Sequence, residues 1–159
     1  MRRRQRQSCA DGPPPSERLA GELDSPQFAR INSLSAGFAV QAVIVGQLTG
    51  LEAITGVFDG APARAGFPYI VVDAGSELDW SNKSAVGREV AIALTLWDDQ
   101  PARVRTLCEA IEARMNSLGG ITGWETTSLH FVRKRVIRDV AGPWAIALDY
   151  RLRLLKLGD

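Results

Sequence analysis

Two stretches rich in β-branched and aromatic residues, joined by a polar crossing, constrain the fold of this chain more than any other feature. Both lie between Phe67 and Trp97, in the sequence FPYIVVDAGSELDWSNKSAVGREVAIALTLW. Residues 69–73 and 89–97 consist largely of side chains that fit a pleated, half-buried surface. The crossing is rich in glycine, serine, aspartate and asparagine, which are typical turn residues. We therefore predict two strands and a connection of about a dozen residues, longer than a usual hairpin loop.

The later part of the chain contains two more predicted strands. Residues 144–154 alternate cleanly, with apolar side chains on one side and charged ones on the other. Residues 89–97 also alternate, with one strongly apolar face and one face of small or mixed side chains. A period of two with one apolar face indicates strands that lie against a core. Residues 128–140 mix apolar and basic side chains, and their alternation slips, which indicates a bulge or a strand that reaches beyond the sheet. We expect the last two strands to form a long antiparallel hairpin with a charged outer face.

Two helices are predicted from apolar residues that recur at steps of three or four. The first covers residues 34–48. The second begins near Pro101, which fits a first helical turn, and it ends at Gly119. Asp98 and Asp99 precede this helix and are its candidate N-caps. Its apolar stripe consists of Val104, Leu107, Cys108, Ile111, Met115 and Leu118.

This order of elements predicts an α+β fold, in which an antiparallel or mixed β-sheet of about four to five strands packs against two helices. The chain has 159 residues, which suits one domain. Residues 1–24 contain few large apolar side chains and three consecutive prolines, so we expect a disordered or flexible N-terminal tail. Residues 25–159 are then a single α+β domain.

The sequence offers little to build an active site, and we expect neither an enzyme nor a cofactor. The GxxxxGK[ST] and GxGxxG phosphate-binding patterns are absent, and the single histidine, His130, is expected to be half-buried in a strand. Cys108 lies in the apolar helix stripe and is expected to behave as a small hydrophobe, and a disulfide with Cys9 is not expected. We therefore predict no catalytic, cofactor-binding or metal-binding residues. No run approaches the roughly 20 apolar residues of a membrane helix, so no membrane partner is expected.

A basic cluster in the last two strands has three interpretations, all of which remain open. The cluster contains Arg133, Lys134, Arg135 and Arg138, with Arg151 and Arg153 on the facing strand. It is a solvated face partly neutralised by nearby aspartates, a charged interface or pore lining in an assembly, or a surface that contacts phosphates. The formal net charge of +1 gives no global electrostatic argument for nucleic acid.

Trp80 is a large aromatic residue within a polar loop. It either folds back onto the domain or serves as an anchor in a protein interface, where tryptophan is over-represented. The loop offers little apolar cover, which favours the interface.

Several short motifs occur in an order that resembles a known protein family. They lie in VFDGAPARAGFPYIVVDAG and in LDWSNKSAVGREVAIALTLW, which are followed by an amphipathic helix and an arginine-bearing closing strand. The residues that carry the likeness are Phe58-Asp59 with Pro62, Phe67-Pro68-Tyr69, Asp79-Trp80-Ser81 with Lys83, and Gly87 before the strand 89–97. Over residues 34–157 the chain resembles the tail-completion, or tail-terminator, proteins of long-tailed bacteriophages and gene transfer agents.

This resemblance implies a structural virion protein made in the bacterial cytoplasm and located at the junction of tail and neck. The resemblance further implies that the protein forms a homo-oligomeric ring, typically hexameric, that caps the tail tube. The expected partners of the protein are the tail-tube protein and the neck or connector protein. DNA would at most pass through the ring lumen. The alternatives are another head–tail connector of the stopper type and a small nucleic-acid-binding module that uses the face from Arg133 to Arg138. The predicted assembly interface consists of Asp79, Trp80, Ser81, Lys83, Arg133, Lys134, Arg135 and Arg151.

Overall fold

Five strands form one mixed sheet in the computed structural model, which describes residues 35–138 and 142–158. Along the chain the elements are α3 (Ala36–Thr49), β1 (Gly56–Asp59), β2 (Tyr69–Asp79), β3 (Gly87–Asp98), α4 (Pro101–Asn116), β4 (Trp124–Arg138) and β5 (Trp144–Lys156). The strand order is β1-β2-β3-β5-β4, with β1 parallel to β2 and the other pairs antiparallel. The predicted boundary between the tail 1–24 and the domain 25–159 lies outside the described residues.

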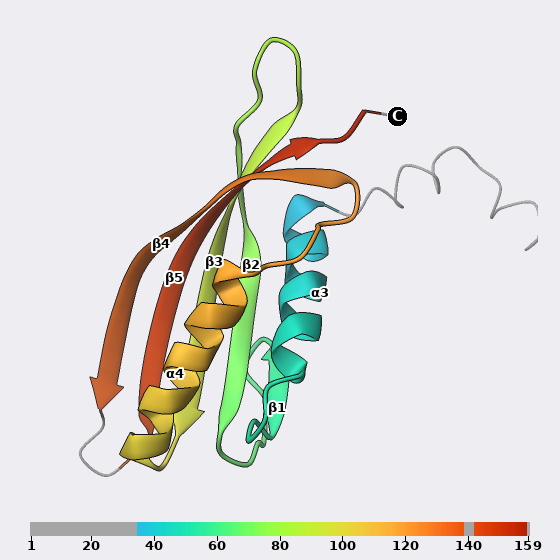
Figure 1. Ribbon diagram of the computed structural model, residues 1–159. Coiled ribbons are helices and arrows are strands. Elements are labelled where there is room, and N and C mark those ends of the chain that lie inside the picture. The colour runs from blue at the N-terminus through green and yellow to red at the C-terminus, as the bar shows by residue number, and fades with distance from the viewer. Residues whose placement is uncertain (1–34, 139–141, 159) are drawn as a thin grey trace, which may run out of the picture. The chain divides into compact units, whose positions relative to one another are not determined.

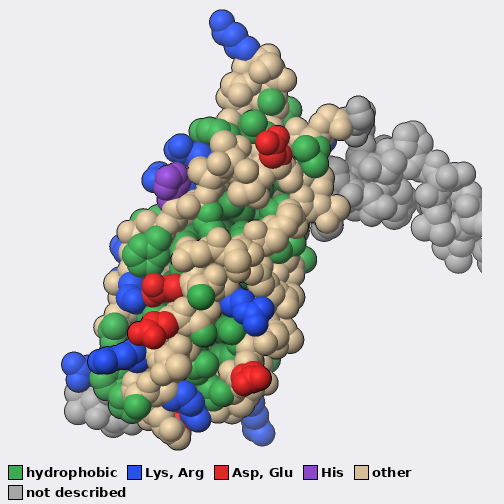
Figure 2. All heavy atoms as spheres, in the orientation of Figure 1, with side chains coloured by type: hydrophobic (Ala, Val, Ile, Leu, Met, Phe, Trp, Pro, Cys, Tyr) green, Lys and Arg blue, Asp and Glu red, His purple; other side chains and the backbone are tan. Residues whose placement is uncertain are grey.

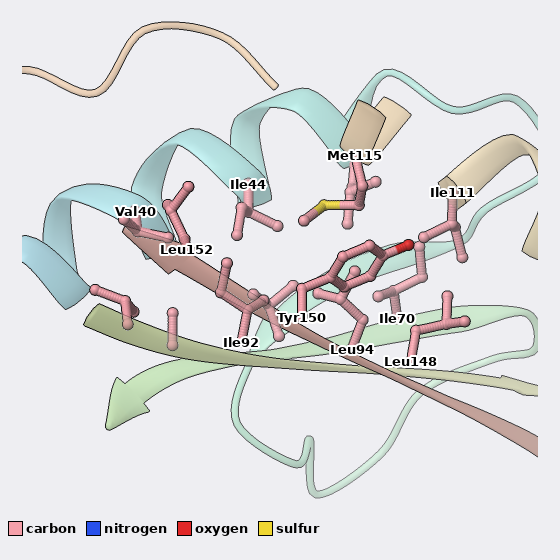
Figure 3. Close-up of a cluster of buried hydrophobic side chains, with 14 of the residues drawn as sticks. Val40, Ile44, Ile70, Ile92, Leu94, Ile111, Met115, Leu148, Tyr150 and Leu152 are labelled. Atoms are coloured by element: carbon pink, nitrogen blue, oxygen red, sulfur yellow. The ribbon is translucent and has the colours of Figure 1, made fainter. Parts of the chain in front are cut away.

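The two described helices cover the same face of the sheet (Figure 1). Among the described residues no helix covers the opposite face, which we call the bare face. The alternation in β3 and β5 explains this arrangement, because every second residue from Val90 to Leu96 and from Ile146 to Leu154 is apolar and buried. Each fully buried Leu or Ile side chain stabilises the fold by about 1.5–3 kcal/mol. The core shown in Figure 3 joins Val40 and Ile44 of α3, Ile70 of β2, Ile92 and Leu94 of β3, Ile111 and Met115 of α4, and Leu148, Tyr150 and Leu152 of β5. The predicted α+β fold with its C-terminal hairpin is confirmed.

The N-terminus of α3 is held directly against β2. Ser35 caps the helix by accepting a hydrogen bond from the Phe38 amide, with an N···O distance of 3.4 Å. The Gly37 amide donates to the Glu77 carboxylate at 2.7 Å. A Cβ at Gly37 would come within 2.5 Å of the Ala74 carbonyl oxygen, so only glycine allows this close approach. Among the described residues no helix is both long enough and apolar enough to span a membrane.

The strands are longer than the sequence predicted. β2 continues to Asp79 through a register shift between Asp73 and Ser76, so the connection to β3 is only residues 80–86. The prediction of a long loop was therefore wrong, because the small and polar residues of this segment form a bulged strand rather than a turn. β4 also begins early, at Trp124. It contains two register shifts, at 126–128 and 131–133, and these confirm the predicted bulge.

The capping role predicted for Asp98 is also wrong. The N-cap of α4 is Gln100, which makes no side-chain capping hydrogen bond, whereas Asp98 is fully buried. The Asp98 carboxylate accepts two hydrogen bonds from the Arg103 guanidinium, at 2.7 and 2.5 Å. Burial opposes ionisation of Asp98, but the hydrogen bonds from Arg103 and from the Gln100 amide hold its pKa below the ordinary value. This ion pair fixes α4 to the end of β3.

We predict that Arg103→Ala destabilises the fold by about 2–3 kcal/mol at neutral pH, because it leaves a buried carboxylate without its partner at a site that is only partly open to water. A carboxyl group with a lowered pKa stabilises the fold above its unfolded pKa, and this contribution is lost as the pH falls through the folded pKa. The difference between wild type and variant should therefore shrink below about pH 4. Urea unfolding at several pH values measures it. The exposed Arg105→Ala is the control, and an equal effect of both substitutions would contradict the prediction.

Candidate assembly interface

The loop between β2 and β3 extends past the ends of the neighbouring strands and is closed at its base by side-chain hydrogen bonds (Figure 1). The Ser81 hydroxyl donates to the Asp79 carboxylate at 2.6 Å, and it accepts from the Gly87 amide at 3.0 Å. Arg88 adds an ion pair to Asp79 at 2.7 Å. The Ser81 hydroxyl and then the Arg88 guanidinium lower the pKa of Asp79. Asp79 and Ser81, both predicted interface residues, thus brace their own loop.

Asn82 organises the tip of this loop. Its side-chain oxygen accepts hydrogen bonds from the backbone amides of Ser84 and Ala85, at 2.9 and 2.8 Å. The backbone amide of Asn82 donates to the Ala85 carbonyl at 3.0 Å, and this hydrogen bond completes a tight turn. Lys83 lies exposed at this turn, and among the described residues it forms no ion pair. Figure 2 shows a basic side chain at the tip of the loop. The loop therefore presents a positive charge on a well-ordered support.

Trp80 lies at the base of the loop and is only half-buried. The Arg153 guanidinium of β5 lies over its ring, 5.2 Å from the ring centroid. A Cβ at Gly87 would collide with the Trp80 backbone and contact its ring, so glycine is required there. Both interpretations of Trp80 retain support, because the indole packs on its own sheet with one part and remains open to solvent with the other.

The predicted basic cluster is divided between the two faces of the sheet. On the bare face, Asp149 pairs with both Arg133 and Arg135, at 2.5 and 3.6 Å. Glu89 likewise pairs with both Arg151 and Arg153, at 3.9 and 2.7 Å. Lys134 points to the helix-covered face instead, where it pairs with Glu112 of α4 at 2.6 Å. Arg133, Arg135 and Arg151 thus form one surface, and Lys134 does not belong to it.

These ion pairs leave the bare face with an excess of positive charge, because each carboxylate is shared by two arginines. The side chains of Arg133 and Arg135 are 60% and 51% exposed, so each pair stabilises the fold by no more than about 1 kcal/mol. A shallow depression of about 500 Å³ lies beside them, and its lining includes the apolar side chains of Leu78, Ala91, Ala93 and Val132. The bare face therefore combines free positive charge with exposed apolar surface, as protein interfaces do.

Comparison with known proteins decides what kind of protein presents this surface. The family model for tail completion protein gp17 matches residues 34–155. The chain belongs to this family. It is therefore a structural tail completion protein of a virion or phage-like particle, and the resemblance drawn from the sequence is confirmed.

Two of the solved structures that are similar to this tail completion protein come from a gene transfer agent and a bacteriophage, and the first of them shares its fold. One is a chain from the virion of a native gene transfer agent particle, with 19% identity and a TM-score of 0.63, and the alignment covers 77% of this chain and 99% of that one. The other is the gp17 protein of bacteriophage SPP1, with 16% identity and a TM-score of 0.47, and coverage of 78% and 92%. No curated protein matches the chain by sequence.

Other residues singled out in the sequence lie partly where expected. Cys108 of the tail completion protein is buried in the α4 stripe. Burial, with a hydrogen bond to Glu112, raises the pKa of its thiol to about 11, so the thiol stays protonated at neutral pH.

His130 is exposed on β4, so the prediction of a half-buried histidine was wrong. Sequence reasoning also missed the contributions of Asn82, Arg88 and Arg153, whose signal is weak because their partners lie on other strands or on the backbone.

We predict that Asn82→Ala loosens the loop tip without unfolding the sheet. It removes the acceptor for the Ser84 and Ala85 amides, so these amides should lose most of their protection against hydrogen exchange. The free energy of unfolding should change by about 1 kcal/mol or less, because both amides are then exposed to water. Lys83→Ala is the matched control at the adjacent position and should leave the exchange of both amides unchanged. Retained protection in Asn82→Ala would contradict this account of the tip.

Proposed function

We propose that this tail completion protein forms a ring, typically of about six copies, that caps the tail tube and joins it to the neck connector. The observation that carries the proposal is the match to the tail completion family over residues 34–155, which includes every helix and strand described except the last residue of β5. In this role the ring ends polymerisation of the tube and offers a new surface to the neck protein.

The open edges of the sheet support a ring. β4 forms one edge, and all its side chains from Phe131 to Arg138 are exposed. At the other edge β1 pairs only with residues 69–72 of β2, so no strand of residues 35–138 or 142–158 pairs with the rest of β2 on that side. A ring needs two different surfaces on each subunit, since each copy contacts its neighbours head to tail. Two dissimilar open edges meet this need.

The braced β2–β3 loop supports a further contact. Its base is fixed by Asp79 and Ser81 and its tip by Asn82, so binding would cost little conformational entropy. Trp80, Lys83 and the arginines of the bare face complete the surface that we propose to contact a neighbouring subunit or the tube.

The proposal predicts a single oligomer of about six copies, either for the purified protein or when the tail-tube protein is added. Mass photometry gives the mass of the particle, and negative-stain electron microscopy shows whether it is a ring. Added during tube assembly, the protein should shorten the tubes by capping them. A protein that stays monomeric with the tube protein present would contradict the proposal. Binding to the connector protein without any effect on tube length would favour the stopper alternative.

The proposed role of Trp80 is tested by Trp80→Ala. The variant should keep its circular dichroism spectrum, because the Trp80 indole is only half-buried. Assembly into the oligomeric ring, or docking to the tube, should weaken by about thirtyfold, which is the effect of a typical interface hot spot. Trp80→Phe, which keeps an aromatic surface for Arg153, is the control and should retain most of the affinity. Unchanged assembly in Trp80→Ala would leave Trp80 as a packing residue of the hairpin base.

A further inference from the structure

Opposite charges are segregated to opposite edges of the sheet, although the chain as a whole is almost neutral. Residues 35–79, which form α3, β1 and β2, contain five acidic residues and one basic residue, Arg64. Residues 124–156, which form β4 and β5, contain seven basic and three acidic residues. The strand order β1-β2-β3-β5-β4 places these two segments at the two sides of the sheet. Residues 80–123 between them are balanced, with five of each sign.

The acidic edge consists of Glu52, Asp59, Asp73 and Glu77. Glu52, Asp59 and Asp73 are exposed. Asp59 accepts a hydrogen bond from the Gln41 side chain at 2.8 Å, and Glu77 accepts one from the Gly37 amide at 2.7 Å. These donors are neutral, and within residues 35–138 and 142–158 none of the four carboxylates forms an ion pair. The acidic edge therefore keeps its negative charge.

The basic edge consists of Arg133, Arg135 and Arg138 along β4. Arg133 and Arg135 share the single carboxylate of Asp149. Arg138 lies over the Trp144 ring, 4.6 Å from its centroid, and among the described residues it forms no ion pair. Figure 2 shows basic side chains gathered along this side of the sheet. Apolar side chains that are about half exposed accompany them, namely Phe131, Val132, Val136 and Ile137.

We propose that the acidic edge of one copy binds the basic edge of the next copy around the ring. The inference rests on the proposed ring and adds which surfaces meet in it. Head-to-tail contact pairs unlike edges at every interface, so each copy has its free charge neutralised on both sides. Like edges repel one another, which disfavours the two-fold dimers that would compete with a ring. The exposed apolar side chains of β4 supply most of the contact area between two copies, and the charges fix how the two copies are oriented.

Two charge-reversal variants test the edges separately. Arg135→Glu with Arg138→Glu changes the charge of the basic edge from +3 to −1, so that this copy has two acidic edges. Glu52→Lys with Asp59→Lys and Asp73→Lys changes the charge of the acidic edge from −4 to +2, so that this copy has two basic edges. Neither set of substitutions changes a buried side chain. Each variant alone should lose the ring, with affinity reduced by about tenfold or more, because every contact then places like charges together. Mass photometry under the conditions in which the wild-type ring forms measures the loss.

An equimolar mixture of the two variants should restore assembly. Copies that alternate around a ring pair unlike edges again, with the charges exchanged at every second contact. Native mass spectrometry should then show oligomers with equal numbers of the two variants. Thermal melts confirm that each variant is folded before mixing. Rings formed by either variant alone, or no assembly from two folded variants together, would overturn the inference.

The control and the competing explanation have distinct results. Arg105→Glu with Arg114→Glu makes the same charge change as the basic-edge variant, but on exposed positions of α4, and should leave the ring intact. If the basic edge binds DNA instead, its reversal abolishes salt-dependent DNA binding but leaves rings intact, which overturns the proposed edge contact. Failure of the wild-type protein to form any ring with the tube protein present would instead refute the proposed function itself.

Discussion

The pairing of β3 with β5 is the constraint on which the rest of the structure depends. These strands pair without interruption from Gly87↔Leu155 to Asp98↔Trp144. Because side chains alternate along a strand, one register places the large buried apolar residues of both strands under the two described helices and places Glu89, Asp149, Arg151 and Arg153 on the bare face. A slip of one residue would reverse both faces, so burial of the core fixes the register strongly. In the folded structure β2 and β4 flank this pair of strands, and the two described helices pack on it.

Much of this fold could be predicted, because the same periodicity that specifies it is visible in the sequence. The α4 stripe and the strands β3 and β5 lie close to their expected positions. The extension of β2 through Gly75 was missed, since a bulged edge strand and a turn use the same small and polar residues. The sequence also indicates a cap at Asp98, because the burial of this residue depends on Arg103 and the end of β3, which only the folded structure brings together.

The candidate interface could be predicted less well, for a physical reason. The motif Asp79-Trp80-Ser81 was expected to contact a partner, but Asp79 and Ser81 hold the loop closed through hydrogen bonds to Arg88 and to the backbone of Gly87. A motif typical of a family can therefore mark residues that hold a loop in shape as readily as residues that contact a partner protein. Lys134 illustrates the same limit, because the bulge at 131–133 decides which face of β4 it occupies. The side chains that this support presents, rather than those that build it, are the better candidates for binding.

The net charge of the chain does not reveal how its charges are distributed over the sheet. A value of +1 for the whole chain argues against a highly charged surface only if charges are evenly mixed, and in this fold they are not. The chain order maps onto the sheet so that its acidic and basic segments occupy opposite edges, and their charges cancel only in the total. A subunit of this kind is neutral in sum yet carries complementary charges at its two sides. Head-to-tail association into a closed ring is the arrangement in which both sides are neutralised at once.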